Sequence, residues 1–302
     1  MGTLTCARCG HVVAIRDGIV NLLHDPPDFV TREAAGLGRF AQVMRDDGWT
    51  RERVVALPEG GGGYWDAQAV LMDQTLGTMD FGPGQTILDL GSNTCWASAE
   101  FARNGLDVTA LDIADHEMQG LRTAEWQFSA KNVFFERVLG MMFALPFANG
   151  SFDYVWACEV LHHNHRKNLL HTLRECFRVL RPGGRLIVAN EPLRSVRTPK
   201  LNPGHEVAEF EGHEHAYMRF SYTTLAKQAG FEVDVRGPWY HRTFRPHGIG
   251  ISERMSDAQI VRAAAATIIR RRPWLSAAVL ATRAYVVGGT ALHMICTKAR
   301  KD

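Results

Sequence analysis

The chain has 302 residues, of which 46% are hydrophobic and 22% are charged, close to the averages for folded globular proteins. These values exclude a disordered or fibrous protein and allow one large α/β domain with additions. The net charge of +2 provides no general attraction for a polyanion, so nucleic acid is not an indicated partner. Most cysteines stand singly in apolar segments and no secretory signal opens the chain, so we expect a reducing, cytoplasmic location.

Residues 1–58 are predicted to form an N-terminal extension, joined to the rest by a glycine-rich run at 59–63. Within it, a Cys6-x-x-Cys9 pair precedes a short β-like run and a turn, and this arrangement resembles half of a zinc ribbon. A structural zinc site needs four ligands, whereas only two thiolates and the neighbouring histidines are at hand. We therefore interpret the module as a ribbon-like remnant that has lost its metal.

A helix is predicted over residues 65–79, and from Thr86 onward short apolar runs alternate with amphipathic segments. Such alternation is typical of βαβ units and a parallel sheet. The runs predicted as strands are 86–90, 107–112, 132–138, 152–157, 185–190 and 231–236. The expected fold is α/β and Rossmann-like: a seven-stranded, mostly parallel sheet with helices on both faces. The expected main domain covers residues 64–240, and residues 241–302 add a helical segment and a closing antiparallel edge strand at 290–297.

The turn after the first of these strands is the first candidate ligand site. Ligands of open α/β sheets bind at the carboxyl ends of the strands, where the first strand-turn-helix supplies a tight turn. Here the turn begins at Gly91, which can adopt backbone angles closed to other residues and so approach a ligand. Asp112 ends the next strand, where a carboxylate can accept both hydroxyls of a ribose.

Further segments follow this turn in a specific order: Ala144-Leu145-Pro146-Phe147, Ser151-Phe152-Asp153-Tyr154-Val155 and Val179-Leu180-Arg181-Pro182-Gly183-Gly184-Arg185-Leu186. Together with the stretches ending at Gly91 and Asp112, they resemble the Rossmann-like (class I) S-adenosylmethionine-dependent methyltransferase family over roughly residues 64–240. A dehydrogenase would give the later segments no role.

The resemblance implies S-adenosylmethionine as the cofactor and assigns residues to its parts. The methionine end would lie against Asp89, Gly91, Ser92 and Asn93. The ribose would lie against Asp112 and Ile113, and the adenine against Met142 and Phe143. Cys158 and Glu159 would lie beside the methyl group. 

Three positions depart from the family pattern. Asn93 and Cys95 stand where the first turn usually has its second and third glycines, although Asn tolerates positive φ. Met141 replaces an aspartate that accepts a hydrogen bond from the adenine in many relatives. A catalytically silent Rossmann partner or scaffold module therefore stays an alternative.

A histidine-rich segment, Cys158 to His165, follows the fourth main-sheet strand. If it forms a helical turn, Glu159, His162 and His163 share one face. Three readings are open: a histidine acts as general base, a divalent metal binds Glu159 with a histidine, or these side chains only form the pocket wall. We favour the base, and no metal ligand is assigned.

The acceptor is expected to bind the loop after the fifth main-sheet strand, because long loops at the carboxyl ends carry specificity in such folds. The candidate substrate residues are Glu191, Arg194, His213, His215 and Tyr217. A basic segment around 270–274 gives a possible peripheral contact with an anionic membrane. The predicted function is methyl transfer to a small-molecule or glycan- or lipid-linked acceptor, with O-methylation assisted by a histidine. An RNA methyltransferase is the alternative enzyme, disfavoured by the near-neutral charge.

Overall fold

The computed structural model of the chain describes residues 2–59, 63–194, 215, 217–236 and 291–300. The strands are β1 (Gly2–Thr5), β2 (Val12–Arg16), β3 (Ile19–Asn21), β4 (Thr86–Leu90), β5 (Asp107–Asp112), β6 (Glu136–Leu139), β7 (Phe152–Cys158), β8 (Leu180–Pro192), β9 (Glu232–Arg236) and β10 (Ala291–Thr297). The α-helices are α1 (Asp28–Asp46), α2 (Arg51–Val55), α3 (Gly63–Thr78), α4 (Trp96–Arg103), α5 (Ala124–Lys131), α6 (Arg166–Val179) and α7 (Arg219–Gln228), and two 3-10 turns are η1 (Leu121–Thr123) and η2 (Leu161–His163).

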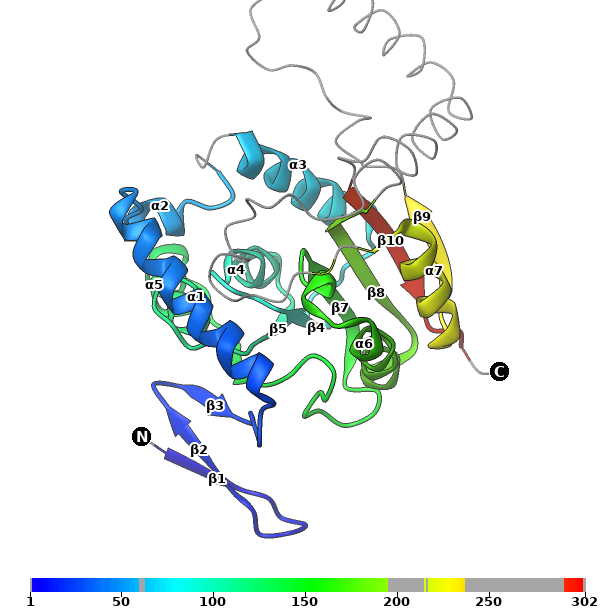
Figure 1. Ribbon diagram of the computed structural model, residues 1–302, viewed down its shortest axis with the longest axis horizontal. Coiled ribbons are helices and arrows are strands. Elements are labelled where there is room, and N and C mark those ends of the chain that lie inside the picture. Colours follow the sequence, from blue (N-terminus) through cyan, green and yellow to red (C-terminus); the bar gives the residue numbers. More distant parts are fainter. Residues whose placement is uncertain (1, 60–62, 195–214, 216, 237–290, 301–302) are drawn as a thin grey trace, which may run out of the picture.

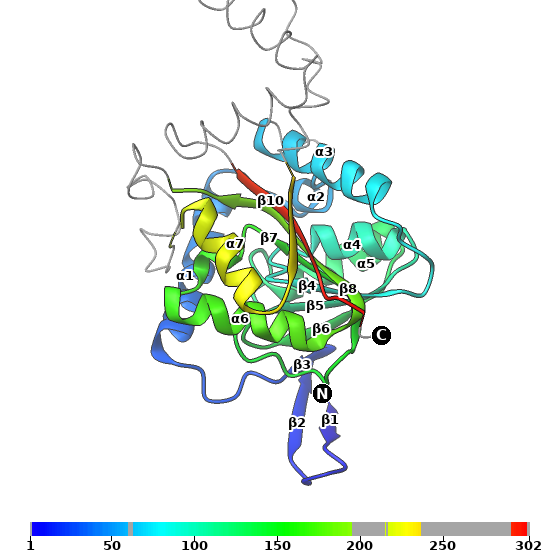
Figure 2. The same ribbon diagram turned by 90° about the vertical axis from the view of Figure 1, so that its right-hand side faces the viewer.

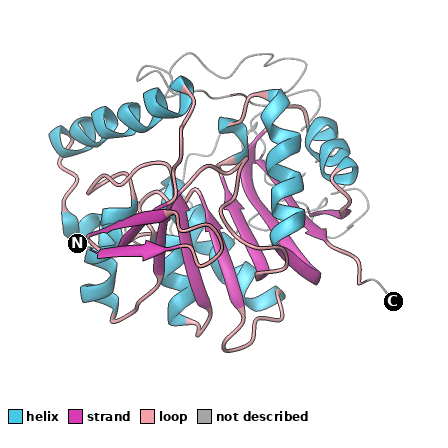
Figure 3. Cartoon of the chain, turned by 90° about the horizontal axis from the view of Figure 1, so that it is seen from below, coloured by secondary structure: helices cyan, strands magenta, loops and turns pink. Residues whose placement is uncertain are grey.

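The strands form a single sheet in the order β1-β2-β3-β6-β5-β4-β7-β8-β10-β9. Strands β6, β5, β4, β7 and β8 run parallel to one another. Helices α6 and α7 lie on one face and α4 and α5 on the other (Figure 2), so the central strands are enclosed between helices (Figure 3). This arrangement confirms the Rossmann-like fold with helices on both faces.

The central strands are apolar because both of their faces are covered. In β4, Ile87 packs into one core cluster, whereas Leu88 and Leu90 pack into the cluster on the opposite face. Along α6, Leu169, Leu173 and Cys176 are fully buried at helical spacing, which is the apolar face that the sequence predicts. The sheet therefore holds the carboxyl ends of β4, β5 and β7 rigidly side by side.

Two features of the sheet differ from the expectation. The sheet has ten strands within the described residues rather than seven, because β1, β2 and β3 extend it. Strand β10 is antiparallel as predicted, but it lies between β8 and β9 rather than at the edge. Its residues Leu292, Met294 and Cys296 are buried, as a strand with neighbours on both sides requires.

The N-terminal segment joins the main sheet through β3, which pairs in parallel with β6. Arg137 of β6 donates to the carbonyl of Asp17 at 2.6 Å and so ties the hairpin turn to the domain. The turn between β1 and β2 lies away from the main sheet (Figure 1), and the Cys6 and Cys9 thiols within it are exposed and unbridged. Within the described part of the chain, no group of three or more His, Cys, Asp or Glu side chains is arranged to hold a metal ion.

Two points concern contact with a membrane. Among the described helices, none combines the length and apolarity needed to cross a bilayer. The basic segment around 270–274 lies outside the described residues.

Candidate cofactor and acceptor site

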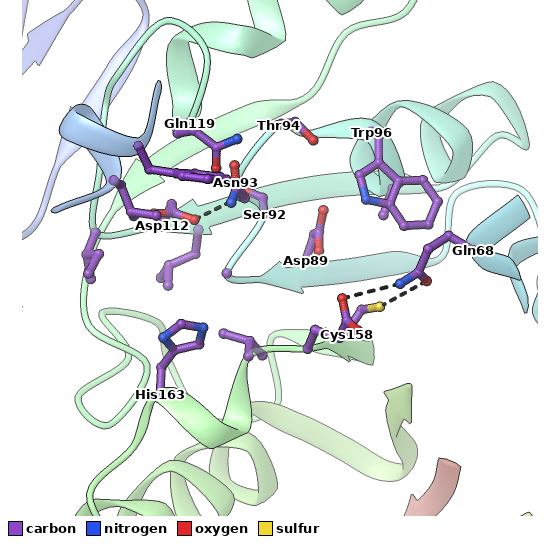
Figure 4. Close-up of a pocket in the computed structure, with 18 of the residues that line it drawn as sticks. Gln68, Asp89, Ser92, Asn93, Thr94, Trp96, Asp112, Gln119, Cys158 and His163 are labelled. Carbon is purple, nitrogen blue, oxygen red and sulfur yellow. Dashed lines mark hydrogen bonds between the residues drawn. The ribbon is translucent and has the colours of Figure 1, made fainter. Parts of the chain in front are cut away.

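A cavity of about 440 Å³ opens at the carboxyl ends of the central strands. Its floor is formed by the ends of β4, β5 and β7 and the turns that follow them, and its walls by α1, α3 and the segment around Trp49. In Figure 4, Asp112 and Gln119 lie on one side and Trp96 and Gln68 on the other, with Asp89 between them. The sheet topology thus places the cavity where ligands of such folds bind.

The turn after β4 has three residues in the left-handed region at alternating positions. Gly91 has φ 72°, Asn93 φ 43° and Cys95 φ 55°. At Gly91 a Cβ would lie 2.3 Å from Cγ2 of Val160, so a side chain would clash there as well as strain the backbone. The turn conformation therefore survives with Asn93 and Cys95 in place of glycine.

Asp112 connects this turn to the end of β5. Its Oδ2 accepts a 2.8 Å hydrogen bond from the backbone N–H of Asn93, and its Oδ1 accepts one of 3.0 Å from Ala114. Burial raises the pKa of Asp112, and the backbone N–H donors oppose that rise by favouring the carboxylate. The carboxylate is therefore fixed in place while facing the cavity.

Unpartnered polar atoms in the cavity wall test whether a cofactor fits here. Oδ1 of Asn93, Oγ1 of Thr94 and Nε1 of Trp156 are buried and have no hydrogen-bond partner among the residues that the structure describes, and all three residues line the cavity. Buried polar groups are nearly always satisfied. These orphan atoms are consistent with a polar ligand such as the methionine end of S-adenosylmethionine.

Asp89 lies at the centre of the floor, and burial shifts the pKa of its carboxyl group toward neutral pH. Burial raises its pKa to about 7, although Ser98 donates a 2.5 Å hydrogen bond that favours the ionised form. Repulsion from Asp112 adds to the rise. A cationic ligand in the cavity would reverse this effect and favour the carboxylate.

Glu159 occupies the α3 side of the cavity. Its backbone lies in the left-handed region at φ 50°, directly after β7. Its carboxylate accepts hydrogen bonds from Tyr64 Oη, from Gln68 Nε2 at 3.3 Å and from Asn190 Nδ2 at 2.6 Å. Gln68 also bridges to Tyr64 at 2.8 Å and to the Cys158 thiol at 3.6 Å. Three neutral donors thus hold one carboxylate against the cavity.

The two histidines of η2 have different surroundings. His163 lines the cavity and pairs through Nδ1 with Glu33 Oε1 of α1 at 2.5 Å. His162 is 4% exposed, does not line the cavity, and lies 3.1 Å through Nδ1 from Oε2 of Glu191. The single face expected for Glu159, His162 and His163 is not formed, because Glu159 lies before the 3-10 turn and points toward α3.

Glu191, expected to contact substrate, is instead fully buried behind η2. Its carboxylate accepts the backbone N–H groups of Val160 and Leu161, each at 2.7 Å, and of His162 at 3.2 Å. The Tyr222 hydroxyl approaches the same carboxylate at 3.5 Å. Glu191 therefore holds the turn that carries the cavity residues, and it does not line the cavity itself.

The other predicted residues divide between the cavity and its surroundings. Of the predicted cofactor residues, the cavity is lined by Asp89, Gly91, Ser92, Asn93, Asp112, Ile113, Met142 and Cys158. Phe143 packs on Phe29 instead, with ring centroids 5.8 Å apart. None of the predicted substrate residues that the structure describes lines the cavity. Arg194 is exposed, the backbone N–H of His215 donates to the His162 carbonyl, and the Tyr217 hydroxyl donates to the Asn164 carbonyl. His213 lies outside the described residues.

The sequence reasoning missed the cavity residues that precede β4. They are Glu33, Leu37, Phe40 and Met44 of α1, Asp47, Trp49, and Tyr64, Trp65 and Gln68 of α3. We expected residues 1–58 to form a separate extension, so α1 had no assigned role. A usable signal was the clustering of Trp49, Tyr64 and Trp65, because aromatic residues near a predicted domain junction often line a ligand site.

The comparisons with known proteins agree with this geometry. Residues 88–188 match the family described as "Methyltransferase domain". The chain is 31% identical over 138 residues to 27-O-demethylrifamycin SV methyltransferase of Amycolatopsis mediterranei, covering 42% of this chain and 49% of that protein. It is 34% identical over 153 residues to demethylmenaquinone methyltransferase of Beutenbergia cavernae, covering 51% and 55%. The chain thus spans about half the length of these curated relatives.

Solved structures share the fold at lower identity. A chain from the complex between a Haloferax volcanii methyltransferase activator and a methyltransferase aligns with a TM-score of 0.51 and 20% identity, covering 92% of this chain and all of that one. The [4+2]-cyclase SpnF aligns with a TM-score of 0.50 and 18% identity, covering 80% and 85%. These likenesses concern the fold alone.

Proposed function

We propose that the chain transfers a methyl group from S-adenosylmethionine to a small-molecule acceptor, and the match of residues 88–188 to a methyltransferase domain supports this. The observation that carries the proposal is the fixed carboxylate of Asp112, bonded to the turn at Asn93 and facing a cavity with unpartnered polar atoms. In this assignment Asp112 holds the ribose, and Asn93 and Thr94 face the methionine end.

The cofactor supplies an activated methyl group on a sulfonium, and the protein must align an acceptor with it. For a hydroxyl acceptor, a base speeds the reaction by taking the proton. We assign this role to His163, because it is the η2 histidine that lines the cavity. Glu33 on its Nδ1 would fix the tautomer and leave Nε2 to accept. His162 would act only by supporting the turn.

The class of acceptor rests on two further points. The two relatives named above are methyltransferases whose names specify small molecules, a demethylrifamycin and a demethylmenaquinone. The net charge of +2 again disfavours an RNA substrate. A glycan- or lipid-linked acceptor is compatible with the cavity but has no separate support.

Titration calorimetry with S-adenosylmethionine and S-adenosylhomocysteine tests the cofactor assignment directly. We expect both ligands to bind, and their binding to depend on Asp112. Absence of binding at millimolar ligand would refute the enzyme reading and favour a silent partner module. Release of S-adenosylhomocysteine in the presence of candidate acceptors then measures the transfer itself.

A further inference from the structure

The α3 side of the cavity contains a polar cluster that the cofactor assignment does not use. It consists of Glu159 and its three donors Tyr64, Gln68 and Asn190. Glu159 directly follows β7 and Asn190 lies near the end of the neighbouring strand β8, and both have positive φ, 50° and 52°. Non-glycine residues in this region carry a conformational cost and concentrate at functional sites. The two strained positions direct the carboxylate and its amide donor toward each other.

The charge of the cavity wall limits what can bind there. Its described lining contains the carboxyl groups of Glu33, Asp47, Asp89, Asp112 and Glu159, and within those lining residues there is no lysine or arginine. An anionic acceptor would meet these carboxylates without a lysine or arginine among the lining residues to balance its charge, and such like-charge contact is unfavourable in a partly desolvated site. An uncharged hydrogen-bond donor, in contrast, matches a carboxylate.

The wall beside Glu159 is aromatic. Tyr64 packs edge-to-face on Trp65 at 5.1 Å, and Trp65 contacts Trp49 at 6.4 Å and Trp96 at 6.1 Å in the same manner. All four rings line the cavity. Such walls favour a planar apolar ligand. When aromatic rings stack or meet edge to face, they gain interaction free energy in addition to that of burying their surface.

The hydroxyl of Tyr64 shows which kind of group the Glu159 carboxylate binds. This phenol hydroxyl donates to Glu159, and Tyr64 is 50% exposed. Because half of its surface is already exposed, moving the Tyr64 side chain away from Glu159 costs only a modest free energy. Gln68, which donates to both the Tyr64 oxygen and Glu159, would remain to orient a replacement. A phenolic hydroxyl therefore already occupies this carboxylate in the free protein.

We propose that Glu159 is the acceptor-binding carboxylate, and that it selects an uncharged aromatic hydroxyl compound. One hydroxyl of this compound, distinct from the group that His163 deprotonates, takes the place of the Tyr64 hydroxyl. The proposal rests on the proposed function for the identity of the ligand as methyl acceptor. The binding claim itself concerns only the cavity, so it can be measured without methyl transfer.

Three naphthalenes with the same ring test the selection: 1-naphthol, 1-methoxynaphthalene, which cannot donate, and 1-naphthoate, which is anionic. Calorimetry with the full chain, with and without S-adenosylhomocysteine, is expected to show naphthol binding at least about tenfold more tightly than the other two. In Glu159→Gln this preference should narrow severalfold or vanish. Tyr64→Phe should keep or improve naphthol binding, because it removes the competing phenol.

Equal or tighter binding of naphthoate, or an unchanged preference in Glu159→Gln, would overturn the proposal. A Glu159→Gln variant that binds S-adenosylhomocysteine more weakly and naphthol normally would also overturn it, because the carboxylate would then serve the cofactor's ammonium group. Glu232→Gln on the exposed strand β9 is the matched control, and circular dichroism verifies folding. If the parent chain fails to bind S-adenosylhomocysteine yet discriminates the naphthalenes, the proposed function fails and this inference stands.

Discussion

The backbone N–H of Asn93 donates a 2.8 Å hydrogen bond to Oδ2 of Asp112. This bond joins the turn after β4 to the end of β5, so two parts of the cofactor site cannot move independently. The site is therefore organised before ligand binds, which lowers the ordering cost of binding.

Asp112→Ala should weaken S-adenosylhomocysteine binding roughly ten- to a hundredfold, because hydrogen bonds to a charged group contribute about 1.5–3 kcal/mol. Calorimetry measures the change. Asp107→Ala, at the exposed start of the same strand, is the control and should bind normally. An unchanged affinity in Asp112→Ala would show that the ribose lies elsewhere.

Cofactor affinity should rise as the pH increases from 6 to 8. The pKa of Asp89 is raised to about 7 by burial, so the group is mainly protonated at pH 6 and mainly ionised at pH 8, where it attracts a cation. Binding at pH 7 should accordingly release protons, seen as a dependence of the calorimetric heat on the buffer's ionisation enthalpy. Asp89→Asn should flatten this part of the pH profile, and an identical profile in both proteins would contradict the assignment.

The effect of substitutions at Asn93 on the free energy of unfolding should depend on how well each residue tolerates positive φ. Asn93→Gly should leave the free energy of unfolding unchanged or slightly higher, because φ 43° costs glycine nothing. Asn93→Val should lower it by about 1–2 kcal/mol. Urea denaturation without ligand compares the two. Similar stability of both variants would mean that the turn relaxes to a conformation without the left-handed residue.

Glu191→Ala should destabilise the chain by roughly 3–5 kcal/mol, because three backbone N–H groups and the His162 ring lose a buried partner. Glu191→Gln should cost less, since its amide oxygen can still accept. Urea denaturation reports these differences. If Glu191→Gln instead keeps full stability and only loses acceptor binding, the original expectation of a substrate contact would be correct.

His163→Gln should lower kcat about 10²- to 10⁴-fold on a hydroxyl acceptor, with S-adenosylhomocysteine affinity nearly unchanged. The assay is release of S-adenosylhomocysteine at saturating cofactor. His171→Gln on α6, which does not line the cavity, serves as the control. A rate that survives His163→Gln would remove the histidine from proton transfer.

The central sheet and the cofactor floor could be predicted because they depend on local signals. The strand ending at Asp89 and Leu90, the glycine at 91 and the acid at 112 each have a backbone or charge requirement that the sequence displays. The positions of β4, β5 and β7 follow from the same alternation of apolar runs, whereas β6 begins four residues later and β8 five residues earlier than predicted. Such features need no knowledge of distant contacts.

The rest of the site depends on contacts between distant segments. Glu33 reaches His163 across 130 positions of sequence, and Tyr64 reaches Glu159 across 95. The hydrophobic periodicity of the sequence does not predict contacts between residues so far apart. Glu191 shows the converse error: a charged residue at a strand end indicates a ligand contact, whereas here the carboxylate satisfies backbone N–H groups that would otherwise be buried without partners.

The pairing of β3 with β6 also affects how the chain behaves outside its active site. Without β3, the outer backbone groups of β6 would form a free sheet edge, and free edges recruit strands from other molecules. The hairpin occupies that edge with a segment of the same chain. The first 21 residues thus move the free edge of the sheet from β6 to the exposed strand β1, so pairing with another molecule would occur at the N-terminal strand and not on the domain that carries the cofactor cavity.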